Sequence, residues 1–150
     1  MELSNEQINE IVEGLESGIQ TFLNIESKEI ITILEWDEFT DTEFWEAMMR
    51  EIEENPDKFL QFHKMNADQG FRILEEFIET IDDENLKSKL ETGLHLQDPF
   101  ENFKIILEND NTYKQKWIEF KHAHYIAFVK KQLAVYNKTI DGKFYDSSQN

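Results

Sequence analysis

Histidine and cysteine, the side chains that most often bind metals or act as nucleophiles, are sparse in this chain. There is no cysteine, so disulfides, thiolate catalysis and cysteine-based zinc or iron–sulfur sites are excluded. Two of the four histidines, His122 and His124, lie two positions apart on an expected helix, where their side chains point about 160° away from each other. Neither a zinc-binding H-E-x-x-H nor a glycine-rich phosphate loop occurs. We therefore predict no catalytic residue, no metal site and no cofactor.

His124 is a histidine whose position leaves two interpretations open. It shares one face of the expected helix with Trp117 and Phe128, which is the pattern of a core-facing position. The preferred interpretation is a buried, hydrogen-bonded histidine. The alternative is a metal ligand or an acid–base group.

Carboxylates are so abundant, 32 in all, that chance pairs in space are expected and any single pair says little. The one acid pair flanked by aromatic residues is Asp37 and Glu38, which lie between Trp36 and Phe39. Two neighbouring carboxylates could share acid–base work. The preferred interpretation is a loop that Trp36 and Phe39 hold against the core. Trp36, Asp37 and Glu38 therefore stand as candidate binding residues rather than catalytic ones.

Basic and aromatic residues alternate in the stretch that follows residue 112. Proteins that bind single-stranded nucleic acid combine such lysines with rings on which bases stack. Here the rings share one helical face, which is the pattern of a core, and the stretch has no arginine. Nucleic-acid binding is therefore the disfavoured interpretation. The rings are Tyr113, Trp117 and Phe120, and the candidate binding lysines are Lys104, Lys114, Lys116 and Lys121.

Charge is distributed unevenly along the 150 residues. Residues 1–110 hold 29 acidic and 8 basic side chains, whereas residues 111–150 hold 3 and 7, and the formal net charge is −17. An acidic body repels nucleic acid and anionic membranes. No apolar run is long enough to span a membrane, and the N-terminus lacks the apolar segment of a secretory signal. We therefore expect a cytoplasmic protein without membrane contact.

The favoured function is a non-enzymatic interaction or regulatory domain that binds a protein with a basic surface. Acidic helix faces, such as that of Glu43, Glu46, Glu53 and Glu54, and the edge of a hairpin are the expected contact surfaces. Two alternatives are weak nucleic-acid binding through the basic C-terminal helix, and an enzyme whose carboxylate site no motif reveals. The sequence indicates neither the partner nor the oligomeric state.

Helix signals dominate a chain that has only 5 glycines and 2 prolines. β-Branched and aromatic runs at 22–25 and 30–34 predict a hairpin, and 59–63 could add a third strand. The predicted fold is α+β and mostly helical, with this small N-terminal antiparallel sheet packed against about six helices. A single globular domain is expected over 1–137, followed by a C-terminal tail, 138–150, in which Asp141-Gly142 signals a turn. The expected helix starts are Ser4-x-x-Gln7, Thr40-x-x-Glu43, Asn66-x-x-Gln69, Asp82-Asp83-Glu84, Asp98-Pro99 (with Asp98 as the capping acid) and Thr112-x-x-Gln115, the last helix ending near Tyr136.

Four segments carry a resemblance to a known family. They are Leu15-Glu16-Ser17, the hairpin Phe22-Leu23-Asn24 to Glu29-Ile30-Ile31, Phe100-Glu101-Asn102-Phe103-Lys104, and Trp117-x-x-Phe120. Together they resemble a bacterial family known only as Uncharacterised Protein Family 0158, over a stretch from about Ile11 to Leu133. The resemblance implies the order of elements given above and brings no activity.

Two departures from the family pattern concern turns. Lys28 takes the place of a glycine that is common in the family's hairpin turn, and Gln97-Asp98-Pro99 replaces a stretch of the Gly-Arg-Gly type. If that arginine binds an anion in the family, this chain has lost it.

Overall fold

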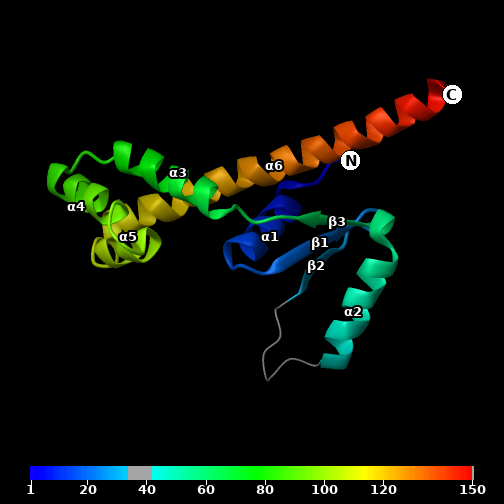
Figure 1. Ribbon diagram of the computed structural model, residues 1–150, viewed down its shortest axis with the longest axis horizontal. Coiled ribbons are helices and arrows are strands. Elements are labelled where there is room, and N and C mark those ends of the chain that lie inside the picture. Colours follow the sequence, from blue (N-terminus) through cyan, green and yellow to red (C-terminus); the bar gives the residue numbers. More distant parts are fainter. Residues whose placement is uncertain (34–41, 150) are drawn as a thin grey trace. The chain divides into compact units, whose positions relative to one another are not determined.

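The computed structural model describes residues 1–33 and 42–149. In this part of the chain the protein is mostly helical (68%), with six α-helices, a short 3₁₀ turn and one three-stranded antiparallel sheet (Figure 1). The predicted α+β class with a small N-terminal sheet is confirmed. The elements, in chain order, are α1 (Asn5–Glu16), β1 (Gln20–Asn24), β2 (Ile30–Ile33), α2 (Thr42–Glu54), the 3₁₀ turn η1 (Pro56–Lys58), β3 (Phe59–Phe62), α3 (Ala67–Glu79), α4 (Glu84–Leu94), α5 (Pro99–Leu107) and α6 (Asn111–Gln149).

The chain folds into two compact units. Unit 1 comprises Met1–Lys64 and Tyr125–Asn150, and unit 2 comprises Met65–His124. α6 contributes its first turns to unit 2 and the remainder to unit 1. Each unit has apolar core residues of its own, supplied by different elements.

Both ends of α1 follow from the sequence. Ser4 is the N-cap: its Oγ accepts a hydrogen bond from the backbone N–H of Gln7 (3.1 Å), and Oε1 of Gln7 accepts one from the N–H of Ser4 (2.8 Å). The predicted capping box is therefore confirmed. At the other end Gly18 has φ +74°, the left-handed conformation that terminates many helices.

The sheet has the strand order β2-β1-β3, with both pairs antiparallel. β1 and β2 form the predicted hairpin, and β3 is the predicted third strand. Phe22 pairs with Ile31, and Leu23 pairs with Leu60. Because successive side chains of a strand point to opposite faces of the sheet, Phe22 and Leu23 lie on opposite faces. In the hairpin turn Lys28 has φ 64°, a backbone conformation that favours glycine.

Unit 1 has three layers (Figure 1). α1 and the later part of α6 cover one face of the sheet, where Leu23, Phe62 and Val129 are buried together with apolar residues of α1. α2 covers the other face, where Phe22 and Ile52 belong to a second buried cluster. Because both faces of the sheet are covered, three consecutive residues in the middle of β1 are buried.

α1 and β1 approach each other closely at Gly14. A Cβ placed on Gly14 would lie 2.5 Å from Oγ1 of Thr21 and 3.4 Å from Cγ2 of Thr32. Thr21 is fully buried, and its hydroxyl donates a hydrogen bond to the carbonyl of Ile19 (3.1 Å). The close packing of this helix on the sheet therefore requires a residue without a side chain at position 14.

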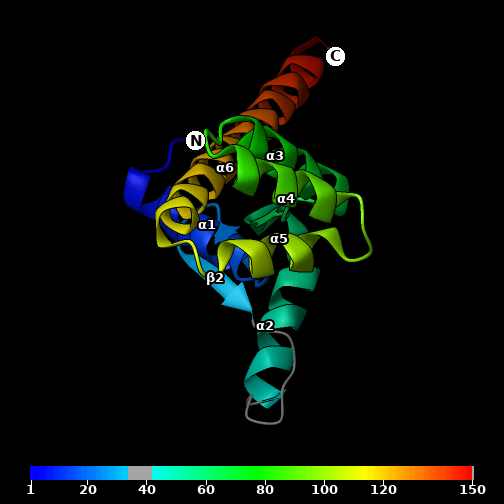
Figure 2. The ribbon, with the colours of Figure 1, turned by 90° about the vertical axis from the view of Figure 1, so that its left-hand side faces the viewer.

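Unit 2 consists of α3, α4, α5 and the start of α6, and α4 and α5 lie side by side (Figure 2). Its core is rich in aromatic rings. The ring centroid of Phe77 lies 6.1 Å from that of Phe103, 5.3 Å from that of Trp117 and 5.4 Å from that of Phe120. Tilted and edge-to-face contacts of this kind join α3, α5 and α6, and α4 adds Leu86, Leu90 and Leu94 to the same core.

Three helix starts in unit 2 match the prediction. Asn66 and Gln69 form a reciprocal capping box at α3. Oδ1 of Asp83 accepts hydrogen bonds from two backbone N–H groups of the first turn of α4. Pro99 occupies the first position of α5, where its missing N–H has no consequence.

Asp98 does not cap α5 as predicted. Its side chain makes no capping hydrogen bond, and its backbone is left-handed (φ 55°). The following Pro99 disfavours the right-handed helical conformation at this position, and aspartate is one of the residues that tolerate the left-handed one. The amide of Asn102 secures the turn instead, because its Nδ2 donates to the carbonyls of Gly93 (3.0 Å) and Gln97 (2.8 Å).

α6 is longer than predicted at both ends. It begins at Asn111, because Oδ1 of Asp110, rather than Thr112, accepts the capping hydrogen bond, from the N–H of Tyr113 (3.0 Å). At the other end the backbone stays helical through Asp141-Gly142 to Gln149, so the predicted turn is wrong. A lone glycine costs a helix about 1 kcal/mol, which does not by itself end it.

Candidate functional site

Three of the predicted binding residues, Trp36, Asp37 and Glu38, lie outside the described residues. The helix start predicted at Thr40 lies outside them as well. The acid pair and its flanking ring therefore stay a prediction from the sequence.

The four candidate lysines all belong to unit 2. Lys104 is exposed near the end of α5, and on α6 Lys114 and Lys116 are exposed whereas Lys121 is half-buried. Lys114 and Lys121 are two helical turns apart and share a face, but Lys116 points away from both. Nζ of Lys116 instead lies 5.0 Å from the ring centroid of Tyr113. The lysines of α6 are thus divided between two faces of the helix.

The rings interleaved with these lysines belong to the core of unit 2. The centroid of Trp117 lies 4.8 Å from that of Phe103 and 5.3 Å from that of Phe77. Tyr113 and Phe120 are half-buried against the same cluster. Rings packed against one another in this way serve the core rather than a row of stacked bases.

His124 is not the buried core histidine that the sequence predicted. Its side chain is 35% exposed, and its ring centroid lies 4.6 Å from that of Phe120. Nε2 lies 3.6 Å from Oε2 of the half-exposed Glu76, which is beyond hydrogen-bonding distance. His124 does share a face with Trp117, as its spacing requires, but it stands at the edge of the aromatic cluster, where water reaches a polar ring.

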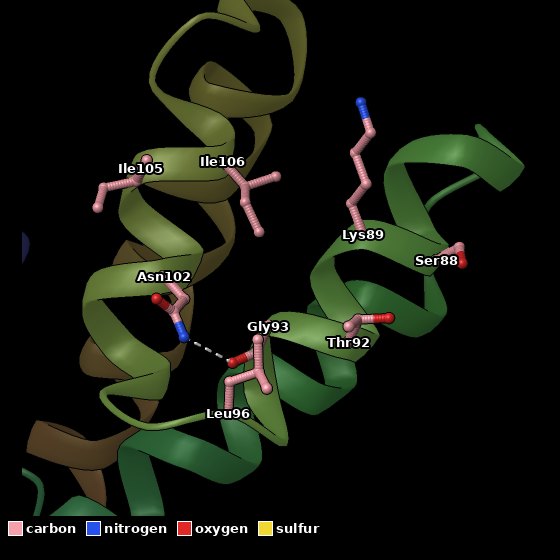
Figure 3. A pocket seen from close by; sticks show the side chains of 8 residues that line it. All are labelled: Ser88, Lys89, Thr92, Gly93, Leu96, Asn102, Ile105 and Ile106. Carbon is pink, nitrogen blue, oxygen red and sulfur yellow. Dashed lines mark hydrogen bonds between the residues drawn. The ribbon is translucent and has the colours of Figure 1, made fainter.

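A groove lies between α4 and α5, and the sequence analysis did not predict it (Figure 3). Its volume is about 380 Å³, and its accessible lining is mostly apolar. The two helices meet near Gly93 and Asn102 and lie farther apart at Lys89, as Figure 3 shows. Its lining residues are Ser88, Lys89, Thr92, Gly93, Leu96, Asn102, Ile105 and Ile106.

Gly93 sets the narrow end of this groove. A Cβ on Gly93 would lie 3.1 Å from Cδ1 of Ile106 and 3.4 Å from Cβ of Asn102. The hydrogen bond from Asn102 to the Gly93 carbonyl ties the two helices together at this point. The shape of the groove is therefore fixed by backbone contacts as well as by side chains.

α1 in unit 1 presents glutamates on the face that points away from the core. Glu6, Glu10 and Glu13 are exposed and follow one another at spacings of four and three residues, so they are neighbours on the helix surface. α1 contains no basic residue, and within the described part of the chain no ion pair joins these three glutamates to a base.

Tyr136 on α6 has a phenol with a shifted pKa. Burial raises this pKa above the usual 10.0, and the negative charge of Asp57 raises it further. Both causes favour the neutral phenol. Tyr136 is therefore uncharged at neutral pH.

Within 1–33 and 42–149, no three histidine, aspartate or glutamate side chains are grouped so that they could hold a metal ion. Over the same residues, no helix combines the length and apolarity needed to cross a membrane.

These features define a class of small α+β protein, with a three-layered unit built on a three-stranded sheet and a helical unit with an aromatic core. The chain belongs to the Uncharacterised protein family (UPF0158), whose model matches residues 3–133. No curated protein and no solved structure matched the chain. The family description names no activity, so function has to be argued from the surfaces of this chain.

Proposed function

We propose that this chain is a non-enzymatic interaction domain that binds a protein with a basic surface through acidic helix faces of unit 1. The observation that carries the proposal is the row of exposed glutamates on α1, namely Glu6, Glu10 and Glu13. Like charges at these spacings destabilise a helix by roughly 0.2–0.5 kcal/mol per pair. A basic partner would remove this repulsion and would be drawn to the surface by its field.

α2 carries a second acidic face on the opposite side of the sheet from α1. Its exposed residues Glu43, Glu46, Glu53 and Glu54 surround Arg50, which lies four residues after Glu46 and three before Glu53. Because Arg50 offsets part of the charge, we assign the main contact to α1 and a supporting one to α2.

The experiment compares affinity capture by variants that differ only in where charge is removed. The wild-type chain, the α1 variant Glu6→Gln/Glu10→Gln/Glu13→Gln and a matched control are used to capture proteins from a lysate of the native source, with and without nuclease treatment. The control, Glu75→Gln/Glu79→Gln/Glu91→Gln, removes three exposed charges from unit 2.

We expect a protein that the wild type and the control retain and the α1 variant loses. With that protein purified, the α1 variant should bind about tenfold more weakly at low salt, and the difference should shrink as salt is raised. Equal binding by all three proteins would contradict the proposal. Captured material that disappears on nuclease treatment would favour nucleic-acid binding instead.

A further inference from the structure

The groove between α4 and α5 has the features of a small-molecule site. We propose that it binds a small organic anion with an aliphatic tail, of the kind represented by a medium-chain carboxylate. The groove lies wholly within unit 2. The proposal is therefore independent of partner binding by the acidic faces of unit 1, and either can fail alone.

The aliphatic tail follows from the walls of the groove. The volume of about 380 Å³ is in the range of small-molecule sites. Leu96 and Ile105 are 61% and 55% exposed, which is a large apolar surface for two residues that line one hollow. A ligand tail laid against this surface would remove it from water, which is the main favourable contribution to apolar binding.

The anionic end follows from the charge of the lining. Among the eight described lining residues, Lys89 alone is charged. Figure 3 shows its side chain extended at the wide end of the groove, across the gap from Ile106. An ammonium group beside aliphatic surface favours a ligand that ends in a carboxylate.

The net charge of the whole chain sets this groove apart from the rest of the surface. At −17, the protein repels anions in general and attracts cations to almost any part of its surface. A mostly apolar groove whose lining carries one positive and no negative charge is therefore a local exception. Selective binding of an anion here would have to come from Lys89 and the aliphatic walls.

Octanoate is the probe for this site, with octylamine and octan-1-ol as controls of equal chain length. Backbone amide chemical shifts of the ¹⁵N-labelled full chain are followed during each titration. We expect saturable octanoate shifts confined to 88–96 and 102–106, with a Kd of about 1 mM for so small a ligand. Octylamine should bind at least about fivefold more weakly, because it meets Lys89 with a like charge.

Two substitutions separate the groove from general surface charge. Lys89→Glu should weaken octanoate binding about fivefold or more, whereas Lys104→Glu makes the same charge change on α5 outside the lining and should change it by less than about twofold. Ile105→Gln, at an exposed position, should also weaken binding without loss of fold. The inference is overturned if octylamine binds as tightly as octanoate, or if Lys89→Glu and Lys104→Glu change octanoate affinity to the same extent. It is also overturned if the amide shifts spread over the whole chain, or if octanoate binding does not saturate by about 20 mM.

Discussion

Replacement of Gly14 by alanine tests whether the packing of α1 on β1 limits the stability of unit 1. The new methyl group would start 2.5 Å from Oγ1 of Thr21, which is fully buried and hydrogen-bonded to the Ile19 carbonyl. Overpacking of this kind costs about 1–3 kcal/mol, whereas alanine is favoured over glycine inside a helix by about 1 kcal/mol. We therefore expect Gly14→Ala to lower the free energy of unfolding by up to about 2 kcal/mol.

The sign of this effect should reverse when the obstructing hydroxyl is removed. In a Thr21→Ala background, the nearest remaining atoms are Cγ2 of Thr32 at 3.4 Å and Cβ of residue 21 at 3.7 Å, which are ordinary contact distances. The cost of overpacking then disappears, and only the preference of a helix for alanine over glycine remains. Gly14→Ala should raise the free energy of unfolding of that variant by up to about 1 kcal/mol.

Urea unfolding followed by far-UV circular dichroism measures all four proteins of this double-mutant cycle. Gly18→Ala is the control: it strains a left-handed position (φ +74°) that has nothing within 4 Å, so it should destabilise both backgrounds equally, by about 1 kcal/mol. If Gly14→Ala destabilises both backgrounds to the same extent, contact with the Thr21 hydroxyl is not the reason for the glycine.

The remaining predictions concern one turn and one phenol. Lys28→Gly removes the strain of a left-handed backbone (φ 64°) but also removes the hydrogen bond from Nζ to the Ile25 carbonyl (2.6 Å). Because the strain is the larger effect, the free energy of unfolding in urea should rise by about 0.5–1 kcal/mol. A fall would refute the strain argument. Burial, and to a smaller extent Asp57, raises the pKa of Tyr136 in the folded protein. The neutral phenol therefore contributes stability below pH 10, and this contribution is lost as the pH rises through the raised pKa. Tyr136→Phe should therefore remove the last step of a tyrosinate absorbance titration and reduce the alkaline loss of stability. A variant that keeps that last step would show that another tyrosine is responsible.

The parts of the fold that were predictable are those whose signal is local. The Ser4 and Asn66 capping boxes each join residues three positions apart, so the sequence contains the whole interaction. The hairpin was readable because β-branched and aromatic residues cluster on both sides of a short turn. The third strand was the limit of this approach, since the pairing of Leu60 with Leu23 joins segments that are far apart in the chain.

The wrong predictions arose where two local signals compete or where burial depends on other elements. Asp98 has the side chain of an N-cap, but the adjacent Pro99 and the amide of Asn102 determine the turn. His124 has the spacing of a core residue, yet spacing fixes only the helix face and not how far the neighbouring helices extend over it. Gly142 marks a turn only when other breakers support it, and here the helix continues past it.

The groove between α4 and α5 could not have been predicted, and the reason bears on how binding sites arise in chains without motifs. Leu96 and Ile105 read in the sequence as ordinary apolar residues, and the narrow stripe of Leu86, Leu90 and Leu94 already accounts for the buried face of α4. What makes the groove is the contact between Gly93 and Asn102, which lie on different helices and fix where those helices part. A glycine beside a neighbouring helix, followed by an apolar residue that the core does not cover, is therefore a combination that only the packed helices reveal. The acidic face of α1 is the opposite case, because Glu6, Glu10 and Glu13 needed only the helix period to be placed together.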